Sequence, residues 1–192
     1  MNPFEPKAPV SGLDISQALE SQHEQLRRAL EELPIEEFVA PQALKWSPAD
    51  HARHLHKSAR PLVQALTAPR IVLWWRFGTR GGASGTYADV REAYRARLAK
   101  GYGANRFAPS AVDIPNDALA WRSEILDGWT ATVRALSAAA GRWRERALDR
   151  YQVPHPLLGK LSMREILFFT LYHNAHHLQL VAERRASGQV PA

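Results

Sequence analysis

Histidines are the residues of this chain with the clearest capacity for metal chemistry. Two groups of three fall in segments with helical periodicity: His51, His54 and His56, and His173, His176 and His177. Two histidines four residues apart on a helix lie about one turn apart on one face, so His173 and His177 can reach the same metal ion. Both stand in line with apolar positions, where unpartnered imidazoles would cost several kcal/mol to bury. His54, or alternatively His51, faces the same way in the earlier segment, so the pattern predicts a three-histidine metal site.

The residues that the chain has, and those that it lacks, exclude several kinds of metal site. The chain has no cysteine, which excludes disulfides, thiolate nucleophiles and cysteine-held metals. The zinc-protease motif His-Glu-x-x-His fails because Asn174 follows the first histidine. A di-iron site needs two Glu-x-x-His motifs, and only one is found, ending at His23. Three neutral histidines with open water positions suit zinc, nickel or iron(II), while the alternative is a set of histidines that hydrogen-bond one another.

Four amphipathic segments must position these side chains, since apolar residues recur in them every three or four positions. The predicted helices span about 14–33, 47–66, 117–148 and 162–187. Ser47 followed by Pro48 marks the start of the second helix, and Ser162 with Glu165 forms a capping box at the start of the fourth. The fourth helix is expected to end near Ser187–Gly188, and no strand is expected. The pattern predicts an all-α four-helix bundle in a single domain spanning 1–192, with a long crossover between helices two and three.

The crossover, about 67–115, is predicted to be an irregular insertion with a short helix from Tyr87 to about Lys100. Long connections of this kind are usually functional or mobile. Trp74, Trp75 and the glycine-rich loop Gly78–Gly85 are candidates to line or cover a pocket. Core packing is expected for at least one of the two tryptophans.

The net charge and the length of the apolar runs indicate whether the protein binds nucleic acid or a membrane. The net charge of +6 permits loose attraction to nucleic acid, but solubility alone calls for a charge of this size. The arginines at 142, 144, 146 and 150 lie where a helix C-terminus favours cations, so nucleic-acid binding is not expected. The longest apolar run, Ile71–Trp75, is far shorter than the ~20 residues that span a bilayer. The N-terminus also lacks the layout of a secretory signal, so we expect a cytoplasmic protein without a membrane partner.

Two patches of the sequence carry a family resemblance. The first is the Trp-Ser-Pro segment from Trp46 to Leu55, which leads to a His-Leu pair. The second comprises the His-Pro-x-x-Gly segment His155–Ser162 and the His-x-x-x-His segment Tyr172–Leu178. Together they resemble the DinB-like superfamily of metal-binding four-helix bundles. The resemblance implies that the metal ligands are His54, His173 and His177, with water completing the coordination sphere.

The resemblance also bears on the residues around the ligands. The family commonly has a glutamine three residues after the last ligand, where this chain has Leu180, with Gln179 one place earlier. His51 and His176 are candidates to orient the ligands or carry protons, the alternative being ordinary helix positions. No catalytic residue is assigned beyond the metal ligands.

Known members of the superfamily include bacillithiol S-transferases and a mycothiol-dependent maleylpyruvate isomerase. The resemblance therefore implies a metal-dependent enzyme of thiol-transferase type, or a related hydrolase or isomerase, acting on a small molecule. A low-molecular-weight thiol would be the co-substrate, because the chain supplies no thiol of its own. The alternative is a non-catalytic metal- or ligand-binding protein of the stress-response type. Bundles of this kind often pair through a helix face, so a homodimer is a further expectation.

Overall fold

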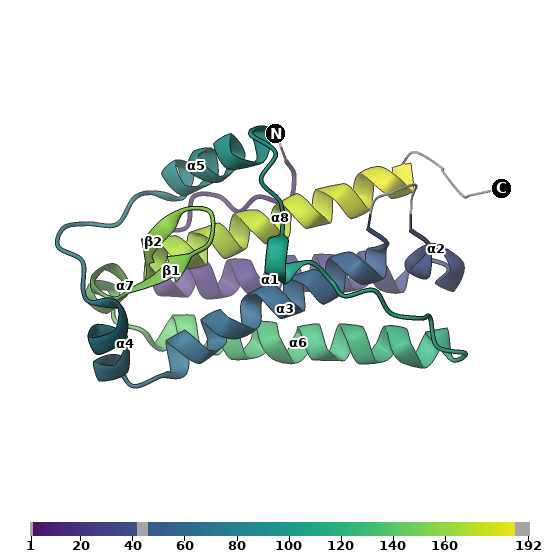
Figure 1. Cartoon of the computed structure of the whole chain (residues 1–192), viewed down its shortest axis with the longest axis horizontal. Helices are drawn as coiled ribbons and strands as arrows, with labels where there is room; N and C mark the ends of the chain where they lie inside the picture. Colours follow the sequence, from purple (N-terminus) through teal and green to yellow (C-terminus); the bar gives the residue numbers. More distant parts are fainter. Residues whose placement is uncertain (1, 42–45, 187–192) are drawn as a thin grey trace.

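Four long helices form the body of the molecule (Figure 1). The computed structural model describes residues 2–41 and 46–186. The long helices are α1 (Gly12–Glu31), α3 (Pro48–Thr67), α6 (Ala118–Arg142) and α8 (Met163–Ala186). Both α1 and α3 pack against α6 and α8, so the four helices enclose a shared apolar core. The predicted all-α bundle with a crossover between its second and third long helices is confirmed.

The helices α3 and α8 begin with the capping interactions that the sequence predicts. The Ser47 hydroxyl accepts a hydrogen bond from the Asp50 amide, the Asp50 carboxylate accepts one from the Ser47 amide, and Pro48 is the first helical residue. Ser162 and Glu165 make the same reciprocal pair at the start of α8. These caps satisfy amides that have no partner within the helix. The expected end of the last helix, at Ser187–Gly188, lies outside the described residues.

The third predicted helix is wrong at its C-terminal end. Instead of continuing to residue 148, α6 stops at Arg142, and a separate short helix, α7 (Glu145–Arg150), follows a break at Trp143. Trp143 is extended, with 7% of its surface exposed, and its indole N–H donates to the Leu66 carbonyl over 2.9 Å. Because a buried indole needs a partner for its N–H group, this tertiary contact outweighs continuation of the helix.

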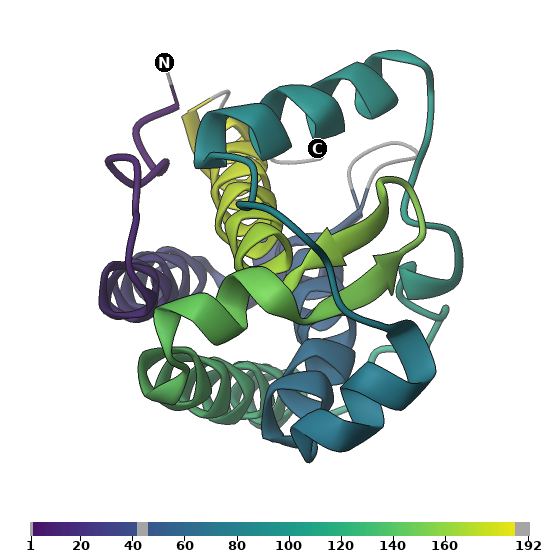
Figure 2. The same cartoon turned by 90° about the vertical axis from the view of Figure 1, so that its left-hand side faces the viewer.

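The expectation that no strand is present is also wrong. The strands β1 (Gln152–His155) and β2 (Gly159–Ser162) pair antiparallel in a small hairpin before α8 (Figure 2). Gly159 closes the turn with a φ of 76°, a conformation that glycine adopts without steric cost. Strands of four residues are too short to show a clear alternation of apolar and polar positions, so no periodic pattern indicates them.

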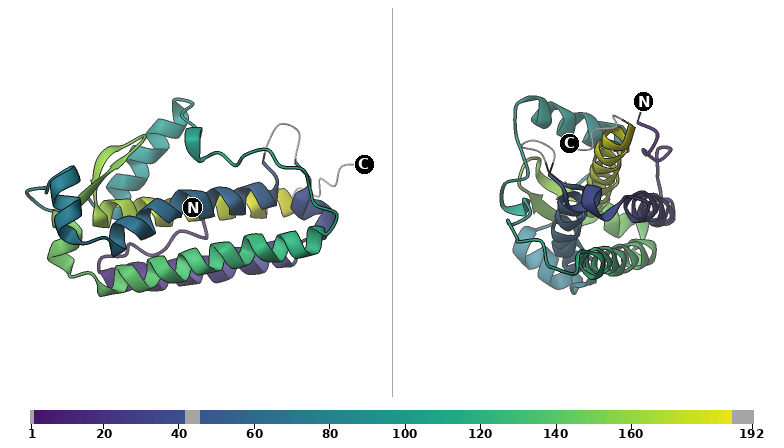
Figure 3. Two further views of the ribbon diagram at one scale, coloured as in Figure 1. Left: turned by 60° about the horizontal axis from the view of Figure 1, so that its bottom comes forward. Right: turned by 90° about the vertical axis from the view of Figure 1, so that its right-hand side faces the viewer.

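The crossover is more ordered than the irregular insertion predicted. It contains α4 (Arg70–Phe77), α5 (Tyr87–Ala99) and the short 3-10 helix η1 (Asn105–Phe107), and α5 begins at the residue expected. A further short helix, α2 (Ile35–Val39), follows α1. Figure 3 shows that α4, α5, η1 and the hairpin gather on one side of the bundle. There α5 packs on α8, while α4 packs on β1.

This second layer changes the environment of α8. Between Met163 and Leu178, all residues are buried except Phe169 and His176, which are half-buried. The bundle covers one side of the helix, while α5 and the hairpin cover the other. The face of α8 that carries histidines is therefore enclosed by the crossover rather than open to water. None of the described helices has the length and apolar character needed to cross a membrane.

A buried carboxylate fastens the loop after α4 to the start of α8. Glu165 accepts hydrogen bonds from the amides of Gly85 and Ser162 at 2.7 and 2.8 Å and forms an ion pair with Arg80 at 2.6 Å. Burial raises the pKa of Glu165, but these hydrogen bonds and the Arg80 charge outweigh it and leave the pKa below its usual value. The ionised carboxylate is thus the form that the fold stabilises.

We expect Glu165→Gln to lower the free energy of unfolding near pH 7 by about 2 kcal/mol, because a neutral amide accepts these bonds less well. The difference from wild type should shrink as the pH falls through the folded-state pKa of Glu165, which is depressed, since the wild-type group then also becomes neutral. Urea denaturation measures it. Glu92→Gln, which changes exposed ion pairs with Arg91 and Arg95, is the control and should cost under about 0.5 kcal/mol. Equal stability of Glu165→Gln and wild type would contradict this account.

Candidate metal centre

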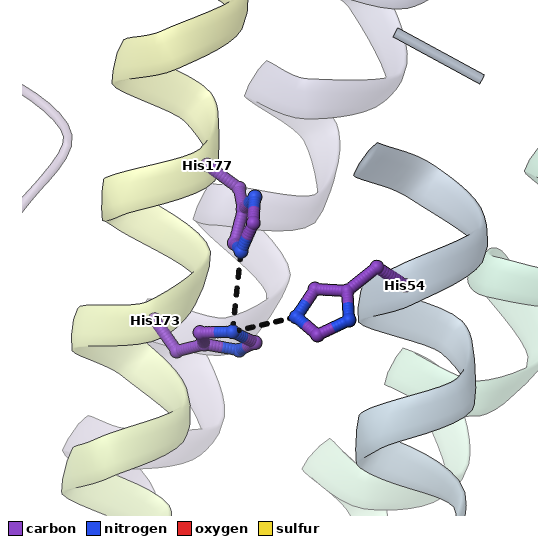
Figure 4. Close-up of side chains that lie close together, drawn as sticks. All are labelled: His54, His173 and His177. Carbon is purple, nitrogen blue, oxygen red and sulfur yellow. Dashed lines mark hydrogen bonds between the residues drawn. The ribbon is translucent and has the colours of Figure 1, made fainter. Parts of the chain in front are cut away.

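Three imidazoles from two helices converge in the space between α3 and α8 (Figure 4). The Nε2 atom of His173 lies 2.9 Å from Nε2 of His54 and 3.2 Å from Nε2 of His177. One ligand atom from each ring falls within 4.8 Å of the others, and all three side chains are buried. Ligands about 2.0 Å from one tetrahedral ion stand about 3.3 Å apart. The two spacings to His173 therefore match those expected around a single ion.

The orientation of His54 is fixed by the crossover. Its Nδ1–H group donates to the Phe107 carbonyl in η1 over 2.8 Å, since a carbonyl can only accept. The remaining nitrogen, Nε2, then carries a lone pair directed at the other two rings. A hydrogen bond from the far nitrogen to a carbonyl is the usual way in which proteins orient a metal-binding histidine.

His51 forms a hydrogen bond with His177, another histidine of the site. Its Nδ1 atom lies 2.7 Å from Nδ1 of His177, so one ring donates to the other. Burial, and then the charges of His54 and His176, lower the pKa of His51 to about 4. His176 has a different contact with His177. Its ring packs edge to face on the His177 ring, with the two centroids 5.4 Å apart, and it forms part of the wall of a cavity. Of these two neighbouring histidines, His51 is the one hydrogen-bonded to a member of the triad, the name used below for His54, His173 and His177.

The donor set of the triad fits a divalent cation. Burial lowers the pKa of His54, and burial together with the neighbouring imidazoles lowers the pKa values of His173 and His177 well below the usual range. Neutral imidazole is the form that binds metal. A neutral His173 has at most one proton on Nε2, so it can donate to His54 or to His177 but not to both. One cation could accept lone pairs from all three rings.

Aromatic rings enclose the triad. Trp46 lies 4.8 Å from His54 between ring centroids and stacks on His177 at 6.0 Å. Phe169, one turn before His173 on α8, stacks on it at 5.1 Å. This apolar shell keeps water from the backs of the imidazoles and strengthens electrostatic interactions inside the site.

A cavity of about 580 Å³ adjoins the three histidines. Its walls come from α3, α4, α5, η1, the hairpin and α8, so the crossover supplies much of the ligand space. The expectation for the two tryptophans is wrong: Trp74 and Trp75 are 51% and 82% exposed, and neither belongs to the described walls. Because α4 packs on β1 through one face, Leu73 is buried and the tryptophans point outward. The Gly78–Gly85 loop also contributes nothing to the described walls.

The glutamine expected from the family pattern is absent from the site. Gln179 hydrogen-bonds Glu183 on the surface of α8, and Leu180 is partly exposed. Two groups at the site went unnoticed in the sequence, the Phe107 carbonyl and the imidazole of His155. A backbone carbonyl leaves no mark in a sequence, whereas His155 is visible in the His-Pro-x-x-Gly segment, which does not show that its ring reaches the cavity.

Comparison with known protein families gives a match over most of the chain. The family model of the DinB superfamily matches residues 18–181, a span that contains all three histidines of the triad. No curated protein and no solved structure gives a significant match.

Proposed function

Because the chain belongs to the DinB superfamily, we propose that His54, His173 and His177 bind one divalent ion, namely zinc, nickel or iron(II). The observation that carries this proposal is the convergence of three buried histidines, one ring nitrogen of each lying within 4.8 Å of the others. All three rings have lowered pKa values and are therefore ready to bind without first losing a proton. Three protein ligands leave at least one coordination position for a substrate or water.

We further propose a metal-dependent transfer of a low-molecular-weight thiol to a small electrophile. A divalent ion at the triad would lower the pKa of a bound thiol and so favour the thiolate near neutral pH. The new sulfur–carbon bond would form as the leaving group departs with its bonding pair. The chain contributes the triad, the aromatic shell that excludes water, and a cavity of about 580 Å³ for the electrophile. The thiol comes from the co-substrate, because the chain has no cysteine.

One observation favours the alternative, a non-catalytic metal- or ligand-binding protein. The described cavity walls contain no aspartate or glutamate that could act as a general base beside the ion. A hydrolase that relies on a carboxylate base is therefore disfavoured, and the walls offer histidines as the candidate bases instead. Turnover assays separate the two functions: the metal-loaded protein is supplied with 1-chloro-2,4-dinitrobenzene and a panel of small thiols. Metal-dependent turnover supports the enzyme, and its absence across the panel supports the binder.

Metal content tests the shared premise of both functions. Untagged wild-type protein purified without chelators should contain about one divalent ion per chain, whereas His177→Ala should retain less than about a tenth of that amount. Elemental analysis makes the measurement. His56→Ala is the control, because that histidine bonds Thr132 away from the triad. Absence of metal from the wild type, even after incubation with zinc, nickel and iron(II), would overturn the proposal.

His51 should tune the affinity for the metal. We expect His51→Ala to weaken metal binding by about 10- to 100-fold without changing its stoichiometry, since the hydrogen bond that orients His177 is lost. Competition with a chromophoric chelator measures the dissociation constant. His176→Ala, which removes only an edge-to-face ring contact from His177, should change it less than about threefold. Equal effects of the two substitutions would mean that the His51–His177 hydrogen bond has no role in binding.

A further inference from the structure

The walls of the cavity beside the triad define what kind of ligand fits. Most of the described wall side chains are apolar, and none is acidic. Representative members are Pro61, Leu62, Leu73, Leu98, Ile166 and Phe169. Cavities of a few hundred Å³ with such walls take small molecules whose body is largely apolar. An apolar body of modest size is therefore the first requirement on the ligand.

Among the described residues that line the cavity, the charged side chains are two arginines. Arg76 comes from α4 and Arg106 from η1, so they reach the cavity from different parts of the crossover. Each guanidinium lies over the neighbouring phenylalanine ring, Arg76 at 5.6 Å from Phe77 and Arg106 at 5.0 Å from Phe107. No salt bridge joins either arginine to a carboxylate among the described residues. Both cations remain available to oxygen atoms of an anionic ligand.

His155 adds a hydrogen-bond donor to the same cavity. Its Nδ1 atom accepts hydrogen bonds from the amides of Leu157 and Leu158, at 3.3 and 3.2 Å, and so closes the turn of the hairpin. In the neutral ring the proton must then be on Nε2. The imidazole packs on Phe169 with centroids 4.2 Å apart and forms part of the wall. Within the described part of the chain, no hydrogen-bond partner is found for this Nε2–H group.

We propose that the cavity binds a small organic anion with an apolar body, and that Arg76, Arg106 and the Nε2–H group of His155 recognise its oxygen atoms. The proposal deepens the proposed function, because it names the substrate class of the cavity beside the metal site. It rests on three agreeing features of the walls: two unpaired cations, one oriented neutral donor and the lack of any acidic side chain. A cationic ligand would find no counter-charge there.

Three probes of the same shape test the selectivity for charge. They are 2-naphthoate, neutral 2-naphthamide and the cation (2-naphthyl)methylammonium, titrated calorimetrically into metal-free protein at physiological salt. We expect naphthoate to bind at least about tenfold more tightly than the amide, and the cation at least about tenfold more weakly than the amide. Similar affinities for the three probes, tighter binding of the cation, or no binding of naphthoate would each overturn the proposal.

Arginine variants separate local recognition from the overall positive charge. Arg76→Gln and Arg106→Gln should each weaken naphthoate binding by about three- to tenfold and leave naphthamide binding unchanged. Arg134→Gln makes the same change in net charge on α6, which contributes no residue to the described walls. If Arg134→Gln weakened naphthoate binding as much as the other two, long-range charge rather than the cavity would be responsible.

Two variants of His155 separate its donor from its role in the turn. Asparagine offers an acceptor near the position of Nδ1 but lacks a donor as distant as Nε2, whereas glutamine offers the distant donor and lacks the near acceptor. We expect His155→Asn to keep the stability of the hairpin and to bind both naphthoate and naphthamide at least about threefold more weakly. His155→Gln should retain more of the affinity and lose more of the stability. The reverse order of affinities would show that His155 serves only the turn.

These binding measurements stand apart from the test of the metal site. The metal-free protein has the cavity without the ion, so a missing metal site would leave the preference for naphthoate intact. Stoichiometric metal together with no preference for the anion would refute the ligand class alone.

Discussion

Lowering the pH from about 7.5 to about 5 will destabilise the metal-free protein by at least about 4 kcal/mol. His51 and His155 account for about 4 kcal/mol, because burial lowers the pKa of each to about 4, and the lowered pKa values of His54, His173 and His177 add to the loss. An unfolded histidine titrates near its ordinary pKa of about 6.5. Below that pH the unfolded chain takes up protons that the folded protein does not, so stability is greatest above about pH 6.5 and falls as the pH is lowered. His51 and His155 each contribute about 2 kcal/mol at about pH 5.

Urea denaturation in the presence of a chelator, at both pH values, measures the change. The lower pH is chosen because the usual pKa values of Glu165 and Asp149 lie below it, so protonation of carboxylates adds little. His155→Asn removes one of the two groups while keeping an acceptor for the turn, and should reduce the loss by about 2 kcal/mol. Equal stability of the wild type at both pH values would show that these imidazoles are not held neutral by the fold.

Zinc will stabilise the wild-type protein by about 4 kcal/mol when its free concentration exceeds the dissociation constant about a thousandfold, and His173→Ala will abolish this gain. His173 is the central member of the triad, since its Nε2 atom is the neighbour of both other ligand nitrogens. Its removal leaves two nitrogens on different helices, which do not hold the ion by themselves. The ion binds the folded protein far better than the unfolded chain, so the binding energy appears as stability.

The measurement is the difference in unfolding free energy with and without zinc, determined for each variant. This difference is independent of any stability that His173→Ala loses through the cavity it creates. His176→Ala should retain the zinc-dependent gain, because that ring lies beside the triad and forms part of the cavity wall. A full zinc effect in His173→Ala would refute the three-histidine site.

The bundle and the common face of His173 and His177 could both be predicted from the sequence, because the signals for them are local and periodic. Ser47 and Asp50 cap α3 through contacts three residues apart, as Ser162 and Glu165 cap α8. The spacing of four between His173 and His177 places both rings on one face of α8 whatever packs against it. The choice between His54 and His51 required more than periodicity: His54 completes the triad, while His51 bonds to His177 from outside it.

Only tertiary structure decided the remaining features, because they depend on contacts between residues far apart in the chain. Trp143 ends α6 where its indole reaches the Leu66 carbonyl, and the Phe107 carbonyl orients His54 across 53 positions. Nothing in the sequence of α4 shows which of its faces meets β1, so the burial of Leu73 and the exposure of Trp75 could not be foreseen. The sequence by itself thus determined the long helices of the bundle and the shared face of His173 and His177, because both are set within single helices. The cavity beside them was decided by how the crossover folds over α3 and α8, since apolar packing is not directional and long-range contacts leave no local pattern.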